Sequence, residues 1–170
     1  MVDAKLYTRP VTRPLIIGAA VTPQTAEWVG SWADGLITIV QPRETMQEVV
    51  QRFQAGGGAG KPMYLQAQHS YAGSESAARQ GALEQWGTNV FPSAVLTELQ
   101  LPQQFDQAAQ FVRPDDLDRS IRISPDLERH IAWLQEDIAL GFEHIYVHNV
   151  NRDQHGFITA FGERVLPALR

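Results

Sequence analysis

The sequence predicts an α/β protein in which four parallel strands alternate with four helices. Three observations lead to this prediction: apolar runs that fit strands buried on both faces, helical apolar stripes between them, and turn residues at the junctions. A chain of 170 residues is long enough for one domain with a sizeable core. We expect that domain to span residues 14–170. The polar segment 1–13, which carries Pro10, is expected to be a linker or an edge segment.

The first strand–helix unit is the clearest. Residues Leu15–Ala20 form an apolar run typical of a buried strand. Thr22 can cap the helix that follows, and Pro23 suits its first position because the missing N–H would have no intrahelical partner. Residues 34–35, Asp-Gly, end this helix just before a second apolar run, Leu36–Val40. The segment therefore predicts a βαβ unit.

A glycine-rich segment follows the second predicted helix, which spans about 43–54. Residues 55–62, AGGGAGKP, have the composition of a phosphate-binding loop, but Ala55 stands where the first Gly belongs and Pro62 replaces the required Ser or Thr. A strand, Met63–His69, follows where a helix should begin. We interpret this segment as a flexible helix-to-strand connector.

The remaining units are predicted with uneven clarity. Ser74 can cap a helix that runs to about Trp86, whereas residues 87–113 show only a short helix after Pro102. Residues 124–128, SPDLE, predict a helix start with a cap and a first-turn proline. Gly141 ends that helix. A strand, Phe142–Val150, and a last helix over 153–169 complete four units, which is half of an eight-stranded barrel.

Two stretches resemble a known family. IIGAAVTPQTAEWVGSWADGLI near the N-terminus and DLERHIAWLQEDIALGFEHIYVHNVNRDQHGFITAFGERVLPALR at the C-terminus are similar to the bacterial-luciferase-like flavin- or deazaflavin-dependent oxidoreductases. The most similar branch is that of the deazaflavin-dependent glucose-6-phosphate dehydrogenases. The resemblance implies that the chain forms the C-terminal half of a TIM barrel, that is, its last four strand–helix units. A complete TIM barrel needs roughly 250 residues. The family's characteristic His for hydride chemistry belongs to the other half.

The resemblance also implies a cofactor site. Parallel α/β folds bind ligands at the carboxyl ends of their strands, and the first such turn is Ala19, Ala20, Val21 and Thr22. The family holds the phosphate of its cofactor, FMN or the deazaflavin coenzyme F420, at this turn. Small side chains and a helix N-terminus suit an anion. The alternative is an ordinary capped helix after a close-packed strand.

Substrate-binding residues are expected after the other strands. Gln41 and Arg43 follow the second strand, where sugar-phosphate enzymes of the family have a Lys that is absent here; this argues against glucose 6-phosphate. His69 and His148 end strands and are expected to face the barrel mouth, although each can equally be structural. His144 lies about 13 Å along the strand from His148, too far for one metal ion. We assign no catalytic residue and no metal site.

Composition narrows the possible functions. The net charge of −5 with scattered Lys and Arg makes nucleic acid an unsuitable partner. The absence of cysteine excludes disulfides and thiolate chemistry. No apolar segment approaches membrane-spanning length, and charged residues stand where a signal peptide would have its apolar core. We therefore expect a cytoplasmic protein.

Two functions remain open. The first is an oxidoreductase that uses a flavin or deazaflavin for hydride transfer or monooxygenation, inactive without the complementary N-terminal half. The alternative is a non-catalytic remnant that binds a flavin or a phosphate. A sugar-phosphate-binding or interaction module unrelated to flavins is a third reading. Because a half-barrel leaves two strand edges open, we expect a homodimer or a complex with the complementary half.

Overall fold

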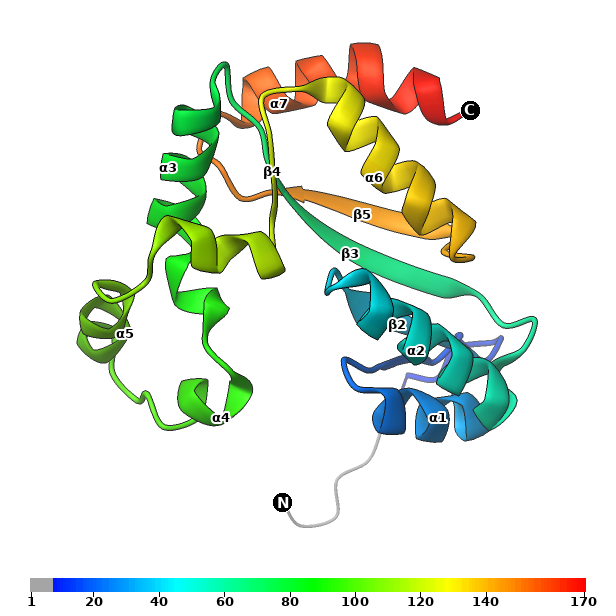
Figure 1. Ribbon diagram of the computed structural model, residues 1–170. Coiled ribbons are helices and arrows are strands. Elements are labelled where there is room, and N and C mark those ends of the chain that lie inside the picture. The colour runs from blue at the N-terminus through cyan, green and yellow to red at the C-terminus, as the bar shows by residue number, and fades with distance from the viewer. Residues whose placement is uncertain (1–7) are drawn as a thin grey trace.

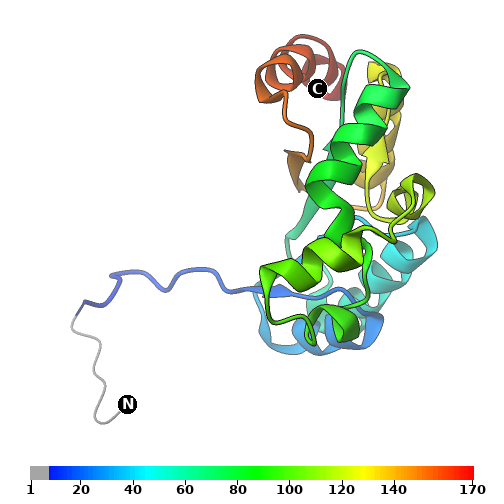
Figure 2. The same cartoon turned by 90° about the vertical axis from the view of Figure 1, so that its left-hand side faces the viewer.

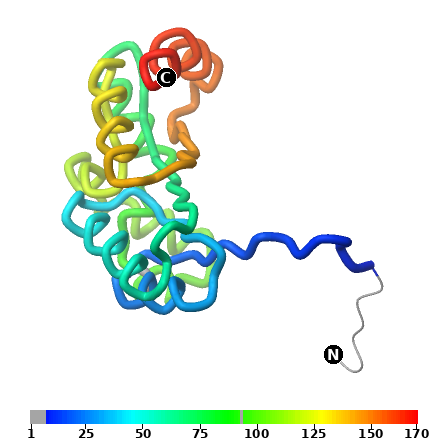
Figure 3. The backbone as a smooth tube through the Cα atoms, turned by 90° about the vertical axis from the view of Figure 1, so that its right-hand side faces the viewer, coloured from blue at the N-terminus to red at the C-terminus, as the bar shows by residue number. Residues whose placement is uncertain are grey.

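The computed structural model describes residues 8–170 (Figure 1). The part of the 1–13 segment before residue 8 lies outside the described residues. Residues 8–16 are all exposed and project from the body of the molecule (Figures 2 and 3). The strands are β1 Ile17–Ala19, β2 Gly35–Ile39, β3 Met63–Ser70, β4 Arg122–Ile123 and β5 His144–Asn149. The α-helices are α1 Pro23–Trp32, α2 Arg43–Phe53, α3 Glu75–Trp86, α4 Ser93–Leu96, α5 Pro102–Ala109, α6 Leu127–Ala139 and α7 Gln154–Ala160.

The predicted α/β class with a parallel sheet is confirmed. Strands β1, β2, β3 and β5 lie side by side in that order, and every pairing among them is parallel. Each is followed by a helix, so the four expected strand–helix units are present. Helical turns Phe161–Val165 and Leu166–Leu169 extend α7 close to the C-terminus, as the prediction of a helix over 153–169 required.

One strand, β4, was not predicted. It pairs with the carboxyl end of β3, where Ser124 N–H donates to the carbonyl of Ser70 at 3.2 Å. The Val40 N–H donates to the carbonyl of Gln66 at 3.0 Å. Carbonyls an even number of residues apart point to the same edge of a strand. β4 therefore pairs with the same edge of β3 as β2 does, beyond the point where the pairing with β2 ends.

Local signals explain the helix ends. The Thr22 and Ser74 side chains accept hydrogen bonds from backbone N–H groups of Thr25 and Ala77, as expected for N-caps. The cap of α6 is Asp126 rather than Ser124, so Pro125 lies before the helix and not in its first turn. The Asp126 side chain accepts from Glu128 N–H, and this bond satisfies a first-turn donor.

The glycine run connects α2 to β3, as expected, and its first part is helical. Residues Gln54–Gly58 continue α2 as a π-helical turn, in which Gly57 has a φ of 103°. A Cβ on Gly56 would lie 2.0 Å from the carbonyl oxygen of Glu27, and one on Gly30 would lie 2.4 Å from the carbonyl oxygen of Phe53. Both glycines are needed because the backbones of α1 and α2 approach each other closely. The glycine run thus allows close packing between the end of α2 and α1.

Hydrophobic clusters fill the space between the sheet and the helices. One cluster lies under α1 and α2 and includes Leu36, Leu65 and Phe53. Another lies under α6 and α7 and includes Leu134 and Phe161. A third lies under α3, which sits at the carboxyl end of the sheet (Figure 1). Within residues 8–170, no helix is long and apolar enough to cross a membrane.

A buried ion pair joins β4 to α6. The Arg122 guanidinium donates to both carboxylate oxygens of Asp137, with Nη1 to Oδ2 at 2.5 Å and Nη2 to Oδ1 at 2.7 Å. The Asp137 side chain is fully buried and that of Arg122 is 9% exposed. Such a bidentate pair fixes the position of β4 against the helix.

Asp137→Leu is expected to destabilise the protein by about 3–5 kcal/mol, because it leaves the Arg122 charge buried without a partner. The double variant Arg122→Met/Asp137→Leu removes both charges and is expected to recover most of that loss. Denaturant unfolding measures both. A double variant no more stable than Asp137→Leu would show that burial of a lone charge is not the cause.

Candidate functional site

The inner face of the sheet carries the polar side chains of the candidate site. On β3, Met63, Leu65 and Ala67 point to the helices and are buried. The alternate residues therefore point to the opposite, inner face. The register of β3 and β5 pairs these inner residues directly across the two strands: Tyr64 with His144, Gln66 with Tyr146, and Gln68 with His148.

The pair Gln68 and His148 is distinguished by unsatisfied polar atoms. Gln68 Oε1 and His148 Nδ1 are buried and have no hydrogen-bond partner among residues 8–170. Gln68 is 5% exposed, and the indole of Trp86 stands edge-on to the His148 ring at 5.1 Å between centroids. A buried polar atom without a hydrogen-bond partner destabilises the folded state. Two such atoms on paired residues therefore indicate a binding site for a polar group of a ligand.

The first turn of α1 offers a second polar feature. Ala20 is buried, whereas Ala19 and Val21 are exposed. Pro23 has no N–H, and the Thr22 hydroxyl already accepts from Thr25 N–H at 3.3 Å. The N–H of Gln24 is therefore the first-turn donor available to an anion, beside the positive end of the helix. The four residues Ala19, Ala20, Val21 and Thr22 lie at the carboxyl end of β1, as expected.

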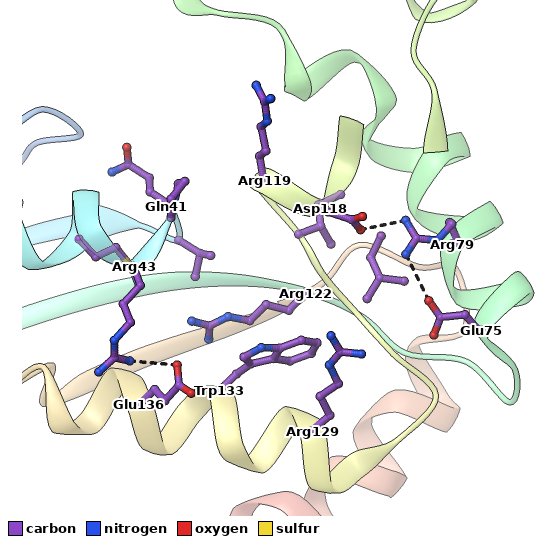
Figure 4. A pocket seen from close by; sticks show the side chains of 15 residues that line it. Gln41, Arg43, Glu75, Arg79, Asp118, Arg119, Arg122, Arg129, Trp133 and Glu136 are labelled. Carbon is purple, nitrogen blue, oxygen red and sulfur yellow. Dashed lines mark hydrogen bonds and ion pairs between the residues drawn. The ribbon is translucent and has the colours of Figure 1, made fainter. Parts of the chain in front are cut away.

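A pocket of about 510 Å³ lies at the carboxyl end of β2, between α2 and α6 (Figure 4). Gln41 and Arg43 line it, and buried Gln41 Nε2 has no partner among the described residues. Arg43 Nη1 donates to Glu136 Oε2 at 3.0 Å. The pocket is rich in arginine: its lining includes Arg43, Arg79, Arg119, Arg122 and Arg129.

The carboxylates of this pocket are already engaged. Arg79 binds Glu75 and Asp118, and the two dashed contacts converge on its guanidinium in Figure 4. Arg129 lies over the Trp133 ring at 5.0 Å from the centroid. Arg43 is therefore not simply a solvent-exposed residue, because it bridges two helices at the rim of the pocket.

His69 does not lie with these residues, and the expectation that it faces the barrel mouth is wrong. It is fully buried on the helix side of β3, on the opposite face from Gln68 and His148. Strand β3 runs one residue further than predicted, to Ser70. His148 lies on the inner face, across from Gln68, and its place at the barrel mouth stays a prediction.

The surroundings of His69 define its tautomer. His130 Nε2 lies 3.0 Å from the carbonyl oxygen of Ser124, which can only accept, so His130 Nε2 carries a proton. In the neutral ring His130 Nδ1 then accepts, and His69 Nδ1 donates to it across 2.7 Å. His69 Nε2 is left unprotonated, without a partner in the described part of the chain. Trp133, Phe161 and Tyr71 surround the pair.

Sequence reasoning missed two features of this region. Asp137 lies on the buried face of α6 with His130 and Leu134, at helical spacing. A carboxylate at a core position indicates a buried cation nearby, and that signal was readable from the sequence. The unsatisfied amide oxygen of Gln68 could not be predicted from the sequence, because its burial depends on how α3 covers the strand.

The comparisons with known proteins agree with this geometry. No family model matches the chain. The F420-dependent glucose-6-phosphate dehydrogenases of Beutenbergia cavernae and Kribbella flavida are each 26% identical to it over 99% of its length. The chain spans about half of these curated relatives, 52% and 53% of their lengths. The resemblance read from the sequence is confirmed.

Solved structures give the fold. An F420-dependent secondary alcohol dehydrogenase in complex with an F420-acetone adduct superimposes with a TM-score of 0.84 at 22% identity, over 99% of this chain and 52% of that one. The F420-dependent tetrahydromethanopterin reductase of Methanopyrus kandleri gives 0.69 at 16% identity, over 92% and 51%. The oxygenating constituent of 3,6-diketocamphane monooxygenase of Pseudomonas putida, complexed with FMN, gives 0.54 at 9% identity, over 91% and 48%. The fold of this chain thus matches about half of each of these structures.

The buried imidazole pair predicts a pH dependence of stability. Burial holds the pKa of His69 well below its ordinary value of 6.5, and the neighbouring His130 and Arg122 add to this effect. Burial also lowers the pKa of His130. Below pH 6.5 the unfolded chain therefore binds more protons than the folded one, and the free energy of unfolding falls as the pH falls, by up to about 1.4 kcal/mol per pH unit for each histidine.

Denaturant unfolding between about pH 5 and 8 tests this expectation. His69→Leu should flatten the dependence, whereas His155→Gln, on the exposed surface of α7, should leave it unchanged. An equal effect of both variants on the slope would contradict the role of burial.

Proposed function

We propose that the chain supplies half of an oxidoreductase barrel that binds a flavin-type cofactor, coenzyme F420 or FMN, at the carboxyl ends of its strands. The observation that carries the proposal is the cross-strand pair Gln68 and His148, with two buried polar atoms aimed at the inner face and no partner within residues 8–170. Ligands of parallel α/β folds bind at this end of the sheet. The curated relatives that align over 99% of the chain are named F420-dependent glucose-6-phosphate dehydrogenases.

The residues present fit such a cofactor at two points. The turn of Ala19, Ala20, Val21 and Thr22 would seat its phosphate, with the Gln24 N–H and the dipole of α1 favouring negative charge. Gln68 and His148 would bind polar atoms of its ring system. The bound cofactor would supply the hydride acceptor or donor, whereas this chain's residues bind it and orient it.

The substrate would lie at the carboxyl end of β2, at Gln41 and Arg43. Both residues line the 510 Å³ pocket at the end of β2, and the guanidinium groups around it favour an anionic or strongly polar compound. His148 would bind the substrate from the inner face of the sheet. We favour hydride transfer over monooxygenation, because the dehydrogenases resemble this chain at higher identity than the FMN-complexed monooxygenase does.

Binding is tested by titrating the purified chain with F420 and with FMN while following cofactor fluorescence. Gln68→Leu removes the unsatisfied amide oxygen, so it is expected to raise the free energy of unfolding by about 1 kcal/mol while weakening cofactor binding roughly tenfold. Opposite shifts in stability and affinity are what a ligand-binding group predicts. A residue that only packs would lower both.

Gln66→Leu, on the same face one pair nearer the start of β3, is the matched control and should leave the affinity within about twofold. No binding of either cofactor would exclude the proposal. Binding without reduction in the presence of candidate alcohols or sugar phosphates would support the alternative of a non-catalytic, cofactor-binding protein.

A further inference from the structure

We propose that a second copy of this chain closes the inner face of the sheet, related by a two-fold axis along the barrel. In this arrangement α1 of each copy packs against α7 of the other. The inference deepens the proposed function, because the partner copy completes the same cofactor site. Three observations lead to it: two open strand edges, the placement of exposed apolar side chains, and an uncovered inner face.

The sheet has open edges at both ends. Among the strands of residues 8–170, β1 pairs only with β2, and β5 pairs only with β3. Because all pairs are parallel, β5 of one copy can lie beside β1 of another and continue the sheet in the same direction. Repeating this contact by the two-fold axis gives a closed ring of about eight strands, the number whose interior side chains fill the barrel.

In the outer layer formed by α1, α2, α6 and α7, most of the exposed large apolar side chains lie on the two terminal helices. Others lie outside this layer, among them Val95, Leu101 and Phe111. On α1, Trp28 is 63% and Trp32 is 43% exposed, with ring centroids 5.2 Å apart. At the other end, Ile158 and Leu166 are 65% and 50% exposed. Between them, α2 has no exposed large hydrophobic residue in the described structure, and α6 has one, Ile138. Within the layer of α1, α2, α6 and α7, exposed apolar side chains thus lie mainly at the two ends.

These side chains lie on the outer flanks of their helices. On α1, Gly30 and the Glu27–Arg52 ion pair mark the side that packs against α2. Trp28 and Trp32, four residues apart, point away from that side.

The same holds at the other end of the layer. Phe161 of the α7 extension contacts His130 of α6, and Arg164 pairs with Glu128 of α6. Ile158 follows buried Phe157 by one residue and therefore turns about 100° away from the buried face. Each flank is an apolar surface that the other can cover.

The inner face needs a cover as well. Tyr64 and His144 stack at 4.6 Å between centroids, Tyr146 stacks on Tyr64 at 6.4 Å, and Tyr146 is 56% exposed. Ile39 of β2 is 39% exposed on the same face. In a two-fold dimer the α1–α7 contact occurs twice, so a second copy would bury the flanks of both chains as well as these inner-face residues. We therefore propose a second copy rather than an unrelated protein.

Complementary charge variants test the two-fold arrangement. Trp28→Lys places a cation on α1, and Ile158→Glu places an anion on α7; each alone should weaken self-association at least about 100-fold, because each homodimer contains two mismatched flanks. Mixed together, the two variants should form a heterodimer. One interface then pairs Lys with Glu, and the other keeps the original Trp28 and Ile158. Ile138→Lys, at an exposed apolar position on α6, is the matched control and should not change association.

Light scattering coupled to size exclusion, with circular dichroism to confirm folding, measures the mass of each sample without cofactor. The expected result is twice the chain mass for the unaltered chain, for Ile138→Lys and for the mixture, and the monomer mass for each flank variant alone. A monomeric unaltered chain at micromolar concentration would overturn the proposal, as would a mixture that stays monomeric or an Ile138→Lys variant that dissociates. Because the readout is mass, the dimer can fail while the cofactor proposal stands.

Discussion

The alternation of side chains along β3 is the constraint on which the rest of the structure depends. This strand hydrogen-bonds to β2, β4 and β5, and its two faces have different tasks. Leu65 and His69 point to the helices and anchor separate parts of the core, whereas Gln68 points inward. A shift of register by one residue would bury the amide against the helices and expose Leu65. Core packing and the position of the candidate ligand groups are therefore fixed by the same strand.

Much of the fold was predictable because parallel strands covered by helices are buried on both faces and appear as continuous apolar runs. Residues Leu36–Val40 are an example: the observed strand, Gly35–Ile39, differs by one residue. β4 was not predictable in this way, since it has only two residues and one is Arg122. Its side chain is buried against Asp137, which lies fifteen residues later in the chain, on α6. The position of Asp137 on the buried face of α6 was readable from the sequence, but its pairing with Arg122 depends on tertiary contact.

The candidate site was predictable in position but not in detail. The rule that ligands bind at the carboxyl ends of parallel strands led to the turn after β1 and to Gln41 and Arg43, which do line a pocket. The same rule failed for His69, because being near a strand end does not determine the face on which a side chain lies. Gln68 and His69 both lie within the predicted strand, so alternation of side chains places them on opposite faces.

In the proposed closed barrel, exclusion of solvent would couple ligand binding to assembly. Trp86 covers His148, whereas Tyr146, two residues earlier on the same face, is open to solvent. A cover over the inner face would lower the effective dielectric around Gln68 and His148, so their hydrogen bonds to a ligand would strengthen while the cost of leaving them unsatisfied would rise. A ligand that contacts both halves would bind the closed barrel more tightly than the open one, and so would favour closure. By thermodynamic linkage, closure would raise the affinity for the ligand by the same factor. In the proposed dimer, the two unsatisfied atoms would thus oppose closure of the empty barrel and would favour closure of the occupied one.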